Sequence, residues 1–284
     1  MQLFGKEIQL RTHDCSICGL MANPIKPYVN LYVKVTNACN ASCPFCSNEH
    51  CGSTADFDIG KFFNILDEIC RSGIRLNRIN LTGGEPSVNS ALVRELLDRM
   101  GSDRRLDAVQ IQINTNLLSD EAHRLAMHPR LDAISISRHH PDGFLKPSDG
   151  QKLGGLPNGK VNLSYVLVKG LNDNAETARK MMDLAISNRI PHLGFVELMP
   201  VNEYAQSHHV SLSDIDWDSI PGLRKEREQC NGTFCQCSNY VYCSNGRFLD
   251  VYMRNYADPT YCKSSLLFDG QYLRQGFQSD NIIF

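Results

Sequence analysis

The chain has 284 residues and a formal net charge of −2 at pH 7, from 29 Lys and Arg against 31 Asp and Glu. This length suits one large domain with a smaller addition, and an apolar fraction of 42% allows a sizeable core. The scattered charges exclude the basic surface of a nucleic-acid-binding protein. No run of eighteen apolar residues occurs, so we expect no membrane-spanning helix. The opening MQLFGKEIQLRTHD lacks the apolar region of a signal peptide, and we expect a cytoplasmic protein without a membrane partner.

Strand and helix patterns alternate along the first 200 residues. The β-branched run 29–36 predicts a strand, and apolar residues spaced i, i+3, i+4 and i+7 predict a helix over 58–73. Further helices are predicted at 90–101, 118–128 (with Ser119 as N-cap) and 173–188, and further strands at 78–86, 108–116, 131–137, 160–168 and 192–198.

Repeated strand–helix units predict an α/β fold with a parallel sheet and right-handed crossovers. Six units indicate a partial (β/α)6 barrel over 29–200, whose active residues gather at the carboxyl ends of the strands. An N-terminal extension, 1–28, precedes it, and a small cysteine-rich, metal-organised C-terminal extension, 201–284, follows it. The Gly- and Pro-rich segment 138–160 predicts either a mobile loop over the barrel mouth or a surface insertion.

Twelve cysteines are present, and without a secretion signal we expect them to stay reduced. Most are clustered, which favours metal binding. Cys51 and Cys70 stand apart, and we expect Cys70 to be a core residue on its helix.

The stretch VTNACNASCPFCSN places Cys39, Cys43 and Cys46 within eight residues, with no fourth cysteine beside them. Three thiolates can hold a [4Fe–4S] cluster by three of its irons and leave the fourth open to a ligand that is not protein. The alternative is a zinc site that takes its fourth ligand from elsewhere.

The segment CNASCPFC closely resembles the C-x3-C-x-aromatic-C signature of the radical S-adenosyl-L-methionine (SAM) enzymes, with Phe45 as the aromatic residue. The resemblance implies that the open iron binds SAM and that the reduced cluster cleaves it to methionine and a 5′-deoxyadenosyl radical. That radical takes a hydrogen atom from the substrate, and a reducing electron donor such as a flavodoxin or ferredoxin is implied. The cofactors carry this chemistry, while the protein orients them and excludes competing reactions.

Two strand ends supply further candidates. Gly83 and Gly84 allow close backbone approach to a ligand, and Glu85 can pair with an ammonium group. The resemblance implies that this GGEP segment meets the amino group of SAM. At the end of the fourth strand, the hydroxyls of Ser135 and Ser137 are candidates for the ribose or carboxylate of SAM.

Other polar residues near the mouth are weaker candidates. Asn114 and Asn116 end the third strand and are comparable SAM contacts. Arg138 can fork onto a carboxylate. Together with His139 and His140 it is a candidate substrate contact, although adjacent loop histidines are usually solvated.

The segments NLSYVLVKGLND (162–173) and FVELMP (195–200) look like the fifth- and sixth-strand segments of the GTP 3′,8-cyclase family. The resemblance implies that Asn162 lies near the ribose of SAM and that Glu197, Leu198 and Met199 pass its adenine. Core packing is the alternative for Met199. The resemblance extends over about residues 30–200. The chain ends in DNIIF, without the cyclase's two terminal glycines, which weighs against GTP cyclisation itself.

The remaining cysteines resemble those of members with SPASM or twitch extensions, which implies one or two auxiliary [4Fe–4S] clusters. The spacing favours Cys235, Cys237 and Cys243 lying close together. Structural zinc is the alternative, and thioredoxin-like chemistry is a further alternative for the first pair. The candidate ligands are Cys15, Cys18, Cys230, Cys235, Cys237, Cys243 and Cys262.

The leading functional hypothesis is a radical SAM enzyme that oxidises, cross-links or epimerises a peptide. The alternative within enzymes is a nucleotide or other small-molecule substrate, as in the cyclase. The alternative from another class is a metal-stabilised binding module without turnover.

Overall fold

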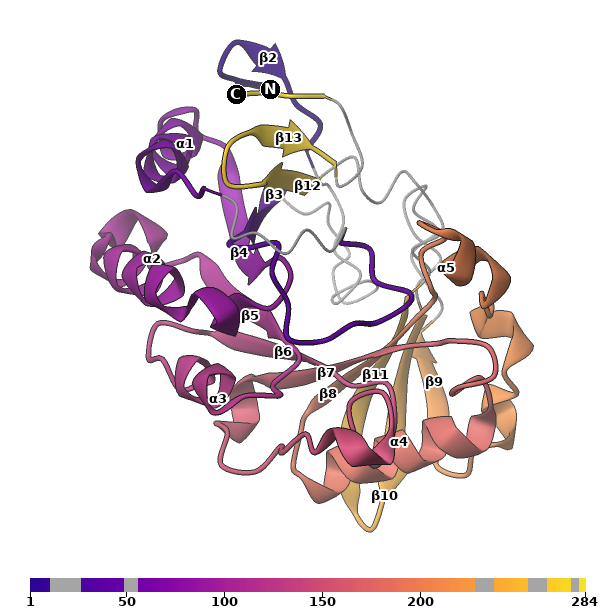
Figure 1. Cartoon of the computed structure of the whole chain (residues 1–284). Helices are drawn as coiled ribbons and strands as arrows, with labels where there is room; N and C mark the ends of the chain where they lie inside the picture. The colour runs from indigo at the N-terminus through magenta and orange to yellow at the C-terminus, as the bar shows by residue number, and fades with distance from the viewer. Residues whose placement is uncertain (11–26, 49–55, 228–237, 255–264, 277–280) are drawn as a thin grey trace.

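The computed structural model describes residues 1–10, 27–48, 56–227, 238–254, 265–276 and 281–284. Six parallel strands form its centre and neighbour one another in chain order. They are β3 (Tyr28–Lys34), β4 (Arg75–Thr82), β5 (Gln110–Thr115), β6 (Ala133–Ser137), β7 (Val161–Val166) and β8 (His192–Val196). This curved sheet, with helices on its outer face, is the predicted partial barrel (Figure 1).

The four main helices begin near the predicted positions and lie along the outside of the sheet (Figure 1). They are α1 (Ile59–Arg71), α2 (Ser90–Ser102), α3 (Asp120–Ala126) and α4 (Ala175–Ser187). Asp58, Ser119 and Asn174 cap three of them by accepting a backbone N–H from the first turn. Between β6 and β7 the chain makes only the short 3-10 turns Pro147–Asp149 and Asn158–Lys160.

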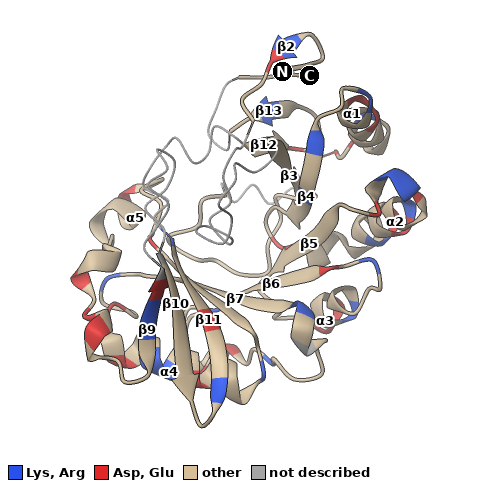
Figure 2. Cartoon of the chain, turned by 180° about the vertical axis from the view of Figure 1, so that it is seen from behind, with Lys and Arg blue, Asp and Glu red and all other residues tan. Residues whose placement is uncertain are grey.

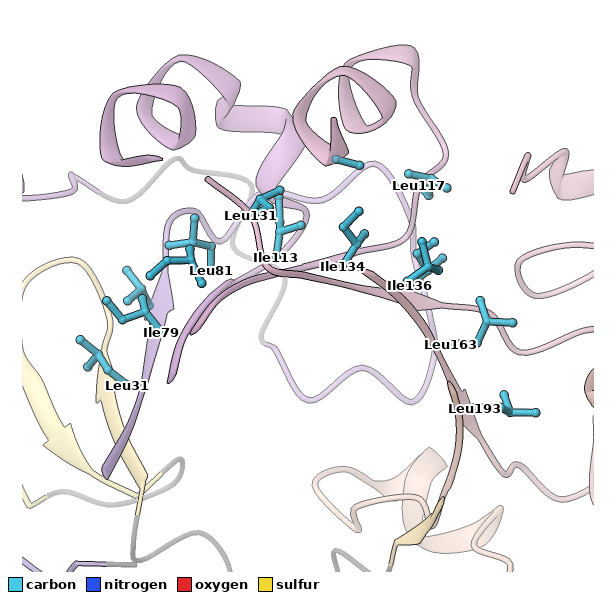
Figure 3. Packing of buried hydrophobic residues seen from close by; sticks show 14 of the residues in the cluster. Leu31, Ile79, Leu81, Ile113, Leu117, Leu131, Ile134, Ile136, Leu163 and Leu193 are labelled. Atoms are coloured by element: carbon cyan, nitrogen blue, oxygen red, sulfur yellow. The ribbon is translucent and has the colours of Figure 1, made fainter. Parts of the chain in front are cut away.

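The hydrophobic core fills the space between the sheet and these helices. Figure 3 shows leucine and isoleucine side chains leaving the strands on the helix side. Leu31, Ile79, Ile113, Ile134 and Leu163 are at most 1% exposed. Because side chains alternate along a strand, the other half of the strand residues face the inside of the barrel.

The C-terminal segment differs from the small, weakly structured extension that we expected. Its strands join the same sheet, so that eleven of the described strands form one sheet. β11 (Arg247–Arg254) runs parallel to β8 and is followed outward by β10 (Ser238–Ser244) and β9 (Leu223–Arg227). β12 (Ser265–Phe268) runs parallel to β3 and pairs with β13 (Leu273–Gln275) on the other edge.

A two-residue turn explains the new hairpin. Asn245 and Gly246 link β10 to β11 with φ angles of 51° and 72°, as the tight turns of hairpins require. A second hairpin, β1 (Gln2–Leu3) with β2 (Lys6–Glu7), opens the chain, and a short helix, α5 (Glu203–Ser207), follows β8. Phe4 stacks on Phe284 with ring centres 3.9 Å apart, which brings the two ends of the chain together (Figure 1).

The surface charges are mixed. Lys and Arg lie among Asp and Glu on the helices and outer strands, and neither sign covers a continuous face in the view of Figure 2. Within the described ranges, no helix has the length and apolar composition needed to cross a bilayer.

Candidate active site

A cavity of about 340 Å³ lies at the carboxyl ends of the parallel strands. Its wall combines the segment 39–48, here called the cysteine loop, with the ends of β4 to β8. Most of the predicted SAM-site residues lie together along this wall: Cys39, Cys43, Phe45, Cys46, Gly83, Gly84, Glu85, Asn114, Asn116, Ser135, Ser137, Glu197, Leu198 and Met199. Asn162 does not line it, although Ser164 of the same strand face does.

The cysteine loop turns its three thiols toward the cavity. The Ala41 N–H donates to Cys39 Sγ and the Asn48 N–H to Cys46 Sγ, both at 3.4 Å. The Cys46 N–H donates to the Cys43 carbonyl at 3.1 Å, which closes a tight turn between these two cysteines.

These thiols fit an iron–sulfur cluster. Burial, and then the nearby Cys46 and Cys39 thiols, raise the pKa of Cys43 to about 12, and burial also raises the pKa of Cys39. Three thiolates therefore need a strong positive charge between them, which bound iron supplies. Among the residues that the structure describes, no three His, Cys, Asp or Glu side chains gather closely enough to bind one metal ion. A four-iron cluster distributes its thiolates over separate irons, so three cysteines can hold such a cluster and leave one iron open.

The two glycines of the GGEP segment have a different partner from the predicted ligand. A Cβ on Gly83 would lie 2.2 Å from the Thr36 carbonyl oxygen, and one on Gly84 would lie 2.1 Å from that of Ala38. The Gly84 N–H donates to Thr36 O at 2.8 Å, and the Glu85 N–H to Ala38 O at 2.9 Å. The close approach that requires glycine is thus to the chain itself, at the base of the cysteine loop.

Glu85 is 1% exposed and binds several donors of the chain. Its Oε1 accepts the Thr115 hydroxyl at 2.8 Å and the Ser87 N–H at 3.1 Å, and its Oε2 accepts the Asn116 N–H at 2.7 Å. Burial raises the pKa of Glu85, and these hydrogen bonds oppose the rise. Glu85 also lines the cavity, where a carboxylate can pair with an ammonium group.

Arg138 does not face the cavity as the sequence suggested. It is 4% exposed, and its guanidinium donates to Gln151 Oε1 at 2.9 Å and to Pro141 O at 2.6 Å. Gln151 in turn donates to the backbone carbonyls of Asn116 and Ser137, at 2.5 and 2.8 Å. Arg138 therefore fastens the loop 138–160 to the ends of β5 and β6 and lines neither this cavity nor the inner face of the barrel.

The sequence analysis missed Phe144 as a cavity residue, whereas it named Asn116 and His139 as candidates. Phe144, from the loop 138–160, lines the wall, so this loop belongs to the barrel mouth. Asn116 Nδ2 donates to Asn40 Oδ1 at 2.6 Å and lies 3.9 Å from Cys39 Sγ. His139 lines the cavity, whereas His140 does not and instead accepts the Asp142 N–H.

Of the candidate auxiliary ligands, Cys15, Cys18, Cys230, Cys235, Cys237 and Cys262 lie outside the described residues. Cys243 is described and lies near the turn end of β10, opposite Phe248. Five residues of extended strand separate it from Ser238 at the start of β10, which is about 17 Å. This distance weighs against Cys243 as a ligand at that end of the strand. The predicted closeness of Cys235, Cys237 and Cys243 depends on residues outside the described ranges and stays a prediction. Cys70 is partly buried and packs against the core.

Residues 33–154 match the family model described as the Radical SAM superfamily. Together with the partial barrel and the cysteine loop, this match supports a radical SAM superfamily member. It is an enzyme whose cofactors are a [4Fe–4S] cluster and SAM.

Within this class, the chain is similar to proteins named for nucleotide chemistry. It is 27% identical over 282 residues to a probable GTP 3′,8-cyclase of Saccharolobus solfataricus, covering 91% of this chain and 86% of that protein. It is 30% identical over 191 residues to the GTP 3′,8-cyclase of Desulforamulus reducens, covering 61% of this chain and 56% of that protein. A solved radical SAM methyltransferase from Sphaerobacter thermophilus gives a TM-score of 0.49 at 20% identity, covering 66% of this chain and 60% of the other. The solved structure of Streptococcus suis SuiB bound to S-adenosylmethionine gives a TM-score of 0.48 at 16% identity, covering 63% of this chain and 42% of that chain.

Proposed function

We propose that this radical SAM enzyme acts on a small polar molecule of the nucleotide class. The relatives named GTP 3′,8-cyclase support this alternative better than the peptide substrate that we first expected. The proposal concerns this class of substrate and does not extend to GTP cyclisation itself.

The observation that carries the proposal is a second cavity, of about 380 Å³, on the inner face of the barrel. Asn114, Ser135, Ser164 and Val196 belong to the walls of both cavities, so the two spaces adjoin. We call this second space the inner chamber. In closed (β/α) barrels bulky branched side chains fill the interior, but amides and hydroxyls line this one. Its polar lining includes Asn80, Gln110, Gln112, Asn162 and Tyr252.

The charges of the inner chamber suit an anionic substrate. Arg78, Lys160 and Arg254 line it, against the single carboxylate of Asp132. The Arg78 Nε donates to the neutral Gln110 amide at 2.6 Å, and Lys160 Nζ donates to the Leu131 carbonyl at 2.6 Å. Because these partners are uncharged, they leave positive charge to attract phosphate or carboxylate groups.

The chain's residues prepare the site for chemistry that its cofactors supply. When bound, the cluster and SAM provide reductive SAM cleavage and hydrogen-atom abstraction from the substrate. Cys39, Cys43 and Cys46 would hold the cluster. Phe45, Val168, Leu198 and Ala205 form an apolar cluster beside Cys43 that excludes water from this side.

An auxiliary cluster remains part of the proposal, with Cys243 removed from its ligands. Cys230, Cys235 and Cys237 precede Ser238, and Cys262 follows Arg254 in the chain. Arg254 lies at the carboxyl edge, where its carbonyl accepts the Glu197 N–H at 2.9 Å. This edge lies beside the cavity at the cysteine loop, because Glu197 lines that cavity. We retain the division into 1–28, 29–200 and 201–284 as a proposal only.

Equilibrium dialysis of the anaerobically reconstituted chain with GTP, GMP and guanosine tests the substrate class. We expect both phosphorylated compounds to bind more tightly than guanosine. Arg78→Met should weaken GTP binding about tenfold, as expected for one lost charge-assisted contact. Arg71→Met, on the outer helix α1, is the matched control. If none of the three binds, or if Arg78→Met binds GTP like the wild type, the inner chamber is not the nucleotide site.

A further inference from the structure

One ring nitrogen in the cavity wall has no role in the site described so far. His139 begins the loop after β6, is 4% exposed and lines the cavity. Its ring meets Phe45 edge to face, with ring centres 5.2 Å apart, and lies 5.4 Å from Phe144.

His139 is held by its backbone and by its ring. Its N–H donates to the Phe144 carbonyl at 2.7 Å, and its own carbonyl accepts Asn172 Nδ2 at 3.0 Å. Its ring Nδ1 accepts the Val166 N–H at 3.0 Å. Three hydrogen bonds, two to the backbone and one to the ring, therefore fix its position and orientation.

The ring bond also fixes the tautomer. A backbone N–H can only donate, so Nδ1 is unprotonated and the proton of the neutral ring is on Nε2. Burial lowers the pKa of His139 to about 3, which keeps the ring neutral at physiological pH.

His139 lines the cavity, and its Nδ1 is occupied by the Val166 N–H. The Nε2–H group is therefore the ring group that remains to meet a ligand in this cavity.

We propose that the Nε2–H of His139 is a fixed hydrogen-bond donor to a ring nitrogen of the adenine of SAM. The proposal rests on SAM occupying this cavity and is independent of the substrate class. Phe45, Phe144 and Val166 contact His139, and Leu198 lines the same cavity. Such apolar and aromatic surfaces suit the face of a base. The ring nitrogens N1, N3 and N7 of adenine are acceptors, so one of them can accept this proton. His139 does not line the inner chamber, which separates it from the proposed substrate site.

Two substitutions test the roles of the two ring nitrogens, Nδ1 and Nε2, separately. In His139→Asn the side-chain oxygen can replace Nδ1 as the acceptor for Val166, but the donor at Nε2 is lost. In His139→Gln the side-chain amide can replace the Nε2 donor, but the acceptor for Val166 is lost. We expect SAM to bind about five- to tenfold more weakly to the Asn variant, the effect of one hydrogen bond, and within about twofold of wild type to the Gln variant.

The measurement is equilibrium binding of SAM to the anaerobically reconstituted full chain. His128→Gln is the matched control, because His128 Nδ1 also accepts a backbone N–H, that of Arg130, but lies outside the cavity. This control should bind SAM like the wild type.

Deaza analogues of SAM, in which N1, N3 or N7 of adenine is replaced by C–H, identify the acceptor. The wild type should bind one analogue more weakly than SAM, and His139→Asn should bind that analogue and SAM equally well. Such coupling would not follow from a purely structural role of His139. The proposal is wrong if the Asn variant binds SAM like the wild type, or if it discriminates the analogues as the wild type does.

Discussion

Glu85 accepts the backbone N–H of Asn116 at 2.7 Å, and this bond ties the end of β4 to the end of β5 directly below the cysteine loop. Glu85 also holds the loop from the other side, because its own N–H donates to Ala38, one residue before Cys39. One carboxylate therefore contributes both to the strand ends and to the cavity wall.

The two roles of Glu85 can be separated by substitution. Glu85→Ala should destabilise the chain, because each buried donor left unpaired costs about 1–3 kcal/mol. Glu85→Gln keeps one acceptor and should lose less stability, but it removes the charge that we expect to pair with the ammonium of SAM. We expect both variants to bind SAM more weakly, measured with denaturation curves alongside. Glu95→Ala, on the exposed face of α2, is the control. Wild-type SAM affinity in Glu85→Gln would contradict the charge pairing.

Gly84 provides a test of how the cysteine loop is supported. Gly84→Ala would place a methyl group 2.1 Å from the Ala38 carbonyl oxygen, so the loop must shift. We expect reconstituted Gly84→Ala to bind clearly less iron than the wild type while keeping its far-ultraviolet circular dichroism. Gly154→Ala, where the added methyl meets no atom within 4 Å, should bind iron normally. Unchanged iron content in Gly84→Ala would show that this close approach does not support the loop.

Gln151 fastens the loop 138–160 to the barrel. Gln151→Ala removes the side-chain donor to the carbonyls of Asn116 and Ser137 and the side-chain acceptor of Arg138, which keeps its bond to the Pro141 carbonyl. We expect a loss of about 2–4 kcal/mol in unfolding free energy and faster hydrogen exchange across 138–160, since unpaired buried groups cost about 1–3 kcal/mol each. Lys152→Ala, an exposed neighbour in the same loop, should change neither quantity. Wild-type exchange in Gln151→Ala would mean that other contacts hold the loop.

The buried His139 makes stability depend on pH. Its pKa falls from 6.5 to about 3 on folding, so between these values the unfolded chain binds one more proton than the folded chain. Stability therefore falls as the pH drops through this window, by about 2 kcal/mol between pH 7 and pH 5. Urea denaturation at both values should show this extra loss in the wild type and not in His139→Asn. The same pH dependence in both proteins would contradict a buried neutral ring.

Local patterns in the sequence predicted the parts of the fold that depend on neighbouring residues. The apolar stripe of α1 and the capping serine Ser119 are both present in the structure. The cysteine motif also predicted its place at the end of the first barrel strand, because chemistry in parallel sheets gathers at that edge. Asn245–Gly246 is an equally clear signal for a hairpin turn, but the cysteines around it favour metal binding as the interpretation of this segment.

The rest depends on contacts between distant residues, which leave no periodic signal. Gln151 reaches Asn116 across 35 residues, and β12 pairs with β3 across more than 200. The glycines of GGEP were recognised, but their partner was not, because Thr36 and Ala38 contribute only backbone atoms. Every residue carries a backbone carbonyl, so the sequence does not indicate which one acts as the acceptor.

Formation of 5′-deoxyadenosine from SAM under reducing, anaerobic conditions tests the central claim most directly. The reconstituted wild type should produce it, and Cys43→Ala should produce none while keeping its circular dichroism, because two thiolates hold the cluster too weakly. Cys70→Ala, a cysteine that lies against the core outside the cavity, is the matched control and should retain the activity. Wild-type production of 5′-deoxyadenosine by Cys43→Ala would contradict the assignment of the cysteine loop as the SAM-cleaving site.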